Sequence, residues 1–159
     1  MPGWPNPRWR EWSYIVAPLP TDRIVMVDVR NLDPPEEQLI RATDVTVVPV
    51  EGNAFEQAIS DLAERCDLIY FHIDSDILDE SLVPNHATKE PNGPDMVQVG
   101  AAIEMVMATG KVAAFAVVSV FGTGAGSEVA IASGVELVQR GLAAWARYGT
   151  ATLPTPPSR

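Results

Sequence analysis

The chain has 159 residues and a formal net charge of −10, and 47% of its residues are hydrophobic. This length fits one folded domain, and the hydrophobic share is too high for a disordered chain. The negative charge argues against nucleic acids and anionic membranes as partners. The single cysteine, Cys66, excludes a disulfide framework and a zinc–cysteine site.

No stretch of the sequence predicts a membrane span or a secretion signal. The longest apolar run, residues 112–121, is about half as long as a membrane helix needs to be. The first residues lack the basic and then apolar order of a signal peptide. We therefore expect a cytoplasmic protein without a membrane partner.

Residues 1–22 form an arm rich in proline and tryptophan, and residues 150–159 form a proline-rich tail. The prolines of the arm forbid regular structure over most of its length. Its three tryptophans are costly to leave in water, so we expect the arm to pack on its own domain or on a second chain. A frayed terminus is the alternative.

Between arm and tail, residues 23–149 predict one α/β domain. The predicted strands are residues 23–30, 45–50, 68–73 and 112–121. The predicted helices are residues 33–42, 54–65, 94–109 and 127–148. This alternation predicts a parallel sheet with helices on both faces, and the last two strands are apolar enough to be buried on both sides.

Polar residues predict where the helices begin. Asp33 precedes two prolines and two acids, and Asn53 and Asp95 stand before two other helices. The glycine-rich residues 122–126 precede the last helix. They are either a tight turn or an anion-binding loop, and we favour the turn because the G-x-G-x-x-G spacing and a Walker lysine are absent.

The third strand leads into the aspartates Asp74 and Asp76. Alternation along a strand predicts that both leave on one face, with His72 one step behind them. Two close carboxylates repel each other, and a divalent cation at the C-terminal edge of a parallel sheet would offset that repulsion. The alternative is that both aspartates are ordinary caps and turn formers.

The segment H-I-D-S-D-I-L-D-E-S-L-V-P-N, followed by T-K-E-P-N-G-P-D, resembles the last metal motif of the arginase/agmatinase (ureohydrolase) family. On this resemblance Asp74 and Asp76 match its two metal-binding aspartates, and Asp79 matches a third, structural aspartate. Glu80 stands where the family usually has proline. In the segment R-I-V-M-V-D-V-R-N-L-D, Arg30 also matches the family pattern.

The resemblance extends over about residues 23–145 and covers only the C-terminal half of the fold. It implies an incomplete, arginase-like, three-layer α/β/α architecture. It also implies manganese, with two ions in the complete family site and at most a part of that site in this chain. The family's other ligands come from G-G-D-H and D-A-H-x-D segments, and this sequence contains neither segment.

Three further residues are candidates for the substrate side of the site. Ser119 stands where the family has a glutamate that binds the substrate guanidinium, and serine cannot form that bidentate ion pair. The resemblance therefore implies a substrate other than arginine. Asn85 and His86 border the mouth of the site, where His86 can also ligate a metal, although we favour a solvent-facing histidine. We expect His72 to orient Asp74 by a hydrogen bond.

Two functions of different class follow from the resemblance. The first is a metal-dependent hydrolase that cleaves a C–N bond in a guanidino or amidino compound, with missing ligands supplied from elsewhere. The alternative is a non-catalytic, truncated arginase-fold protein that serves as an oligomerising or partner-binding module. Because half a sheet leaves a strand edge and apolar faces uncovered, we expect a homo-oligomer or a complementary chain.

Overall fold

The computed structural model describes residue 12 and residues 17–149. In this part of the chain the strands are β1 (Val25–Val27), β2 (Thr46–Val48), β3 (Ile69–Asp74) and β4 (Val112–Val118). The helices are η1 (Thr21–Arg23), α2 (Pro34–Arg41), α3 (Asn53–Arg65), η2 (Ser75–Ile77), α4 (Met96–Ala108) and α5 (Ser127–Tyr148). The order of strands and long helices is the predicted one.

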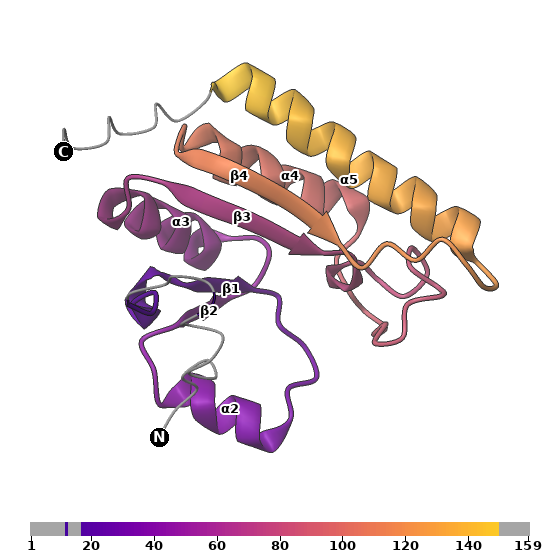
Figure 1. The fold of residues 1–159 in the computed structure, drawn as a ribbon, viewed down its shortest axis with the longest axis horizontal. Coiled ribbons are helices and arrows are strands. Elements are labelled where there is room, and N and C mark those ends of the chain that lie inside the picture. The colour runs from indigo at the N-terminus through magenta and orange to yellow at the C-terminus, as the bar shows by residue number, and fades with distance from the viewer. Residues whose placement is uncertain (1–11, 13–16, 150–159) are drawn as a thin grey trace.

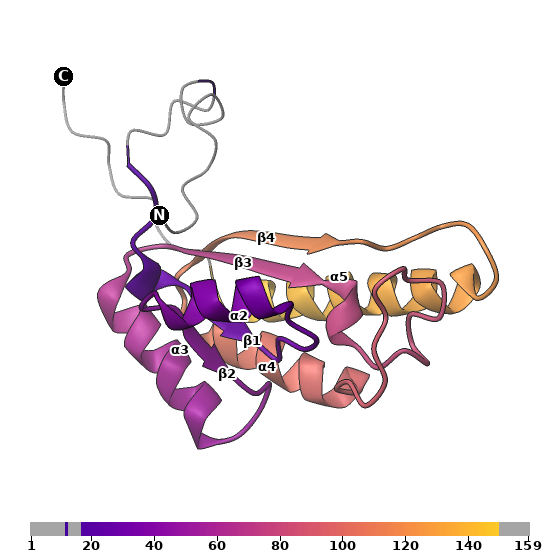
Figure 2. The same cartoon turned by 90° about the horizontal axis from the view of Figure 1, so that it is seen from below.

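The strands pair in parallel, as two two-stranded sheets (Figure 1). Strand β1 pairs with β2, so that Val27 lies opposite Val48, and β3 pairs with β4, so that Asp74 lies opposite Val118. Helices α4 and α5 lie on the same side of the β3–β4 pair (Figure 2). The architecture is therefore an incomplete parallel α/β fold.

The prediction that β3 and β4 are buried on both sides is wrong. Ile69 and Ile73 of β3 are buried, but Tyr70, which points to the other face, is 64% exposed. In β4 only Val112 is fully buried, and most of the other residues are partly exposed. The strand also ends three residues earlier than expected, because Ser119 has a φ of 60°, which breaks the extended backbone.

The core lies between these strands and the helices that cover them. Phe55, Leu78, Ile103, Met107 and Leu137 are among its fully buried side chains. Helix α3 buries Phe55, Ile59 and Leu62, and helix α4 buries Val99, Ile103 and Val106. A packed core of this kind positions the ends of the strands, where the polar residues gather.

Asp95 caps helix α4 as predicted, whereas the predicted cap of α3 by Asn53 is wrong. The Asp95 carboxylate accepts hydrogen bonds from the backbone N–H groups of Val97 and Gln98, at 2.8 and 2.9 Å. Such a cap stabilises a helix by about 1 kcal/mol. Asn53 does not cap α3; it is the first residue of the helix, and Gly52, with a φ of 90°, takes the capping position.

The predicted packing of the arm can be followed only at its described residues. Residues 1–11 and 13–16, like the tail from residue 150 on, lie outside the described part of the chain. Trp12 is 71% exposed, so this tryptophan does not pack on its own domain, and packing on a second chain stays a prediction. Among the described residues, no helix is both long enough and apolar enough to span a membrane.

Candidate metal centre

Three side chains that can ligate a metal meet just beyond the C-terminal end of β3. Asp74 is the last residue of the strand, Asp76 lies in η2, and His86 lies in the loop that follows. Their ligand atoms all lie within 4.8 Å of one another. The structure thus brings the two predicted metal ligands together and adds to them a histidine from the predicted substrate side.

The two aspartates do not leave one strand face in the way that simple alternation predicts. The chain turns after Asp74 into the single turn of η2, and the Asp76 backbone N–H lies 3.5 Å from the Asp74 carboxylate. Asp76 therefore reaches the cluster from a turn and not from the strand. Half of the Asp74 side chain and about a third of the Asp76 side chain remain accessible to solvent.

Arg30 fixes this turn from the neighbouring sheet. Its guanidinium donates hydrogen bonds to the carbonyl oxygens of Asp76 and Ile77, at 2.6 and 2.9 Å, and lies 3.5 Å from the Asp28 carboxylate. The sequence marked Arg30 only as a match to the family pattern. Its role in holding the turn could not be predicted, because its partners are backbone carbonyls 46 or more residues away.

Asp79 organises the loop after η2 and does not belong to the cluster. Its carboxylate accepts hydrogen bonds from the Ser81 hydroxyl at 2.6 Å, the Ser81 N–H at 3.0 Å and the Gly93 N–H at 3.3 Å. The hydroxyl bond of Ser81, followed by the backbone bonds, lowers the pKa of Asp79 below its usual value. Gly93 is needed here, since a Cβ at this position would lie 2.6 Å from the Asp79 nitrogen.

Ser119 touches the cluster directly. Its hydroxyl donates a hydrogen bond to Asp74 Oδ2 at 3.0 Å, and its carbonyl oxygen accepts a bond from the Ser75 hydroxyl at 2.9 Å. The ends of β4 and β3 are thereby joined at the site. The structure thus places this predicted substrate-side residue against a predicted metal ligand.

Asn85 joins two loops instead of facing the cluster. Its amide donates hydrogen bonds to the carbonyl oxygens of Phe121 and Thr123, at 2.8 and 2.9 Å. The glycine loop meets the same segment, because a Cβ on Gly126 would lie 2.5 Å from Pro84. The glycine at this position thus serves close packing, which agrees with the favoured interpretation of a tight turn.

His86 is buried, so the favoured interpretation of a solvent-facing histidine is wrong. The side chain is 6% exposed, and the Phe121 ring packs edge-on against the imidazole at a centroid distance of 5.0 Å. Nδ1 lies 3.1 Å from the Thr88 hydroxyl, which donates a hydrogen bond to Asp76 Oδ2 at 2.7 Å. Nε2 is buried without a hydrogen-bond partner and lies 3.5 Å from Asp74 Oδ1.

His72 does not orient Asp74. Its Nδ1 lies 3.0 Å from the Tyr70 hydroxyl, and both side chains are on the exposed face of β3. The Asp74 carboxylate is held instead by the Ser119 hydroxyl. Sequence reasoning missed Thr88, whose hydroxyl bonds to Asp76, since a threonine in a loop gives no signal of such a contact.

The sequence of this chain matches the model of the arginase family over residues 8–141. The chain belongs to the arginase family. The match begins inside the proline- and tryptophan-rich arm, earlier than the start near residue 23 expected from the motifs. Whether this chain can bind a metal therefore depends on which of the family's ligand residues it contains.

A curated relative is the N(omega)-hydroxy-L-arginine amidinohydrolase of Streptomyces lavendulae. It is 34% identical over 92 residues, which make up 58% of this chain and 33% of the relative. The chain thus matches about a third of the length of this relative.

Solved structures show the same fold. The formimidoylglutamase of Bacillus subtilis superposes with a TM-score of 0.73 at 15% identity, over 87% of this chain and 46% of the neighbour. An arginase of the same species has a TM-score of 0.64 at 22% identity, over 77% of this chain and 48% of the neighbour. The chain spans less than half the length of these arginase-fold proteins.

Proposed function

We propose that this chain forms the C-terminal half of an arginase-type hydrolase that cleaves a C–N bond in a guanidino or amidino compound. The observation that carries the proposal is the meeting of Asp74 and Asp76 at the end of β3, within a motif that resembles the family's last metal motif. The curated relative is named an amidinohydrolase, which supports the same reaction class.

The residues at this edge fit a divalent metal such as manganese. Carboxylate oxygens suit manganese, and a buried imidazole nitrogen without a partner is a further donor within reach. Asp74 and Asp76 would hold the ion. Manganese bound there would activate a coordinated water, which loses a proton near neutral pH.

The other residues at the site position these two ligands. Ser119 fixes the rotamer of Asp74 through its hydroxyl, and Thr88 does the same for Asp76. Arg30 holds the turn that carries Asp76. Since Ser119 is neutral, the chain offers no carboxylate at this position for a guanidinium, which favours a substrate other than arginine.

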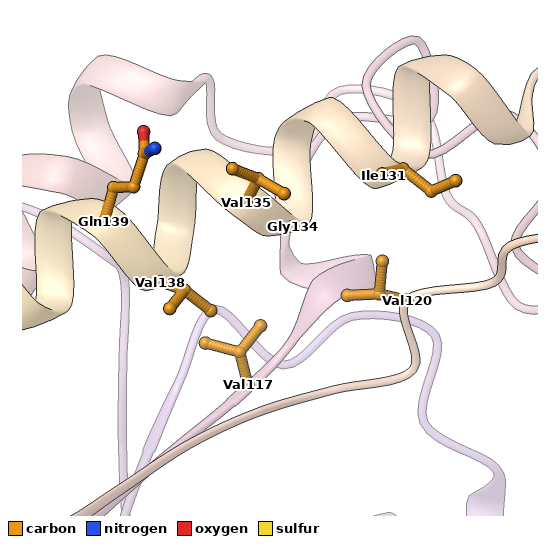
Figure 3. Close-up of a pocket in the computed structure, with 7 residues that line it drawn as sticks. All are labelled: Val117, Val120, Ile131, Gly134, Val135, Val138 and Gln139. Carbon is orange, nitrogen blue, oxygen red and sulfur yellow. The ribbon is translucent and has the colours of Figure 1, made fainter.

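Another polypeptide would cover an exposed apolar surface of this chain, and ligands from G-G-D-H and D-A-H-x-D segments could come only from a chain other than a second copy, because this sequence contains neither segment. An apolar groove of about 330 Å³ runs between the end of β4 and helix α5, and Figure 3 shows its lining. Val117 and Val120 form one wall, while Ile131, Val135 and Val138 of α5 form the other. We propose that a second copy of this chain covers the groove, because its lining is apolar and places no like charges against each other.

Native mass spectrometry of the purified chain at micromolar concentration tests the partner. We expect a homo-oligomer that dissociates in the variant Val135→Glu, because a carboxylate in this groove is costly to desolvate. The exposed substitution Val97→Glu on α4 is the control and leaves the oligomer intact. A monodisperse monomer contradicts a second copy and points to a complementary chain instead.

An assay for urea or ammonia release from a panel of guanidino and amidino compounds tests the activity. We expect turnover that depends on manganese and is lost in the double variant Asp74→Asn/Asp76→Asn. The variant Asp22→Asn/Asp44→Asn removes the same charge from exposed positions and retains turnover. If the assembled protein turns over none of these compounds while binding metal, the hydrolase proposal fails.

One observation favours the alternative, a non-catalytic module. Among the described residues the cluster consists of two carboxylates and one histidine, which is fewer than a binuclear site needs. In that case the fold serves assembly through the groove of β4 and α5. Oligomers without turnover on any compound of the panel would support this second function.

A further inference from the structure

We propose that His86 is a metal ligand and that, with Asp74 and Asp76, it forms a one-ion centre complete within this chain. The ion belongs to the divalent transition metals, such as manganese, cobalt or zinc. This inference rests on the proposed metal role of the two aspartates, and it is independent of whether the chain catalyses a reaction.

The burial of His86 is the first observation. The side chain is 6% exposed, yet Nε2 makes no hydrogen bond. A buried polar nitrogen without a partner costs free energy, and such groups in folded proteins call for an explanation. A metal ion between the imidazole and the carboxylates would satisfy this atom.

The separation of the donor atoms is the second observation. Nε2 of His86 lies 3.5 Å from Asp74 Oδ1 and makes no hydrogen bond to it. Two ligand atoms that each lie about 2.1 Å from one ion, at the tetrahedral angle typical of zinc, are about 3.4 Å apart. The gap between these atoms is therefore the gap expected of two ligands of one ion.

The surroundings of Nδ1 are the third observation. The backbone N–H of Thr88 lies 3.2 Å from Nδ1, so that Nδ1 accepts its hydrogen bond and the ring proton is on Nε2 when no ion is bound. An ion bound to Nε2 would require the ring proton on Nδ1, where the Thr88 hydroxyl would accept it at 3.1 Å and the bond from the Thr88 N–H would be lost.

Thr88 thereby connects two ligands. Its hydroxyl donates to Asp76 Oδ2 at 2.7 Å and can accept the Nδ1 proton of His86 at the same time. Partners of this kind fix the tautomer and orientation of a metal-binding histidine. Thr88 is thus a positioning residue of the centre.

The donor set defines the class of ion. One imidazole and two carboxylates suit manganese, cobalt and zinc, whereas calcium prefers six to eight oxygen ligands and magnesium retains most of its water. The alternative to a metal site is a protonated His86 that forms ion pairs with Asp74 and Asp76. In the protonated ring, as in a ring bound to an ion through Nε2, Nδ1 carries a proton and cannot accept the bond from the Thr88 N–H, so metal titration is what separates the two forms.

The test titrates the purified chain with manganese, zinc and calcium by calorimetry. We expect one manganese or zinc ion per chain and no displacement by calcium. The variant Thr88→Val lowers the affinity for manganese by up to about 10- to 100-fold, and His86→Gln, which removes a ligand, lowers it more. The variant His72→Gln is the matched control, because His72 lies on the exposed face of β3, and it leaves the affinity unchanged.

Pulsed electron paramagnetic resonance of the manganese-loaded wild type tests the nitrogen directly and does not depend on whether the His86→Gln variant folds. We expect a nitrogen coupling from a coordinated imidazole, which persists in the His72→Gln variant. Manganese bound without this coupling would overturn the role of His86 and leave that of the aspartates intact. If the wild type binds no metal, the metal roles of His86 and of the two aspartates are both overturned. The activity assay then tests the hydrolase proposal by itself.

Discussion

The Arg30 guanidinium donates a hydrogen bond of 2.6 Å to the carbonyl oxygen of Asp76, across 46 positions of the chain. The same group reaches the carbonyl of Ile77, so one side chain that follows β1 fixes the turn at the end of β3. The two strands belong to different sheets. Arg30 therefore connects the two sheets at the proposed metal centre.

Replacement of Arg30 by lysine should loosen this turn. Lysine keeps the charge but cannot present the planar fork of donors, so the carbonyl of Asp76 or of Ile77 loses its partner. We expect a loss of stability of about 1–3 kcal/mol and a manganese affinity reduced about tenfold. Chemical denaturation and calorimetry measure the two effects. The exposed Arg41→Lys is the control, and equal behaviour of both variants would contradict the role of Arg30.

Removal of the Ser119 hydroxyl should weaken metal binding without unfolding the protein. Both Ser119→Ala and Ser119→Gly lose the hydrogen bond to Asp74 Oδ2, so we expect a similar fall in manganese affinity, up to about tenfold. The glycine variant should be more stable than the alanine variant by about 1 kcal/mol, because the φ of 60° strains any residue with a Cβ. Unchanged affinity in both variants would contradict the role of the hydroxyl.

Alanine substitutions in the glycine loop should separate packing from backbone strain. Gly124 and Gly126 both have positive φ angles, 91° and 84°, but only a Cβ on Gly126 meets Pro84. Gly124→Ala should cost about 1–2 kcal/mol from strain alone, and Gly126→Ala should cost more. Thermal unfolding measures the stability of each variant. Equal losses of stability would show that Pro84 can move aside at little cost in free energy.

The stability of the protein should depend on the ionisation of Asp79 at acid pH. Hydrogen bonds from Ser81 and Gly93 lower the pKa of Asp79 in the folded state below the usual value of 3.8. Its contribution is therefore present above pH 3.8 and is lost as the pH falls through the lower folded pKa. We expect Asp79→Asn to be less stable at neutral pH, with a difference that shrinks in strong acid. Carbon NMR of the Asp79 carboxyl group checks the pKa, and a value above 3.8 would contradict the assignment.

Local signals in the sequence were enough to predict the elements. Asp95 and Gly110 mark the two ends of α4, and the parallel pairing follows from the alternation of strands and helices. The family motif also identified the two aspartates at the end of β3. These features depend on a few neighbouring residues, and so they can be derived from sequence.

Contacts made over long distances in sequence could not be predicted. The burial of His86 depends on Phe121, which comes from the far end of β4, and Asp74 is oriented by Ser119 from the same region. The expected bond from His72 failed for a related reason. His72 contacts Tyr70 on the exposed face of β3. The sequence does not show which face of the strand the helices cover, so this contact could not be predicted.

Asp74, Asp76 and His86 are separated by at most twelve positions along the chain. The entropy lost in closing so short a loop is small. Residues 74–86 transferred alone to another parallel sheet would carry the three donors without Arg30, Ser119 and Phe121, which hold them in this chain, so we expect such a graft to bind metal more weakly.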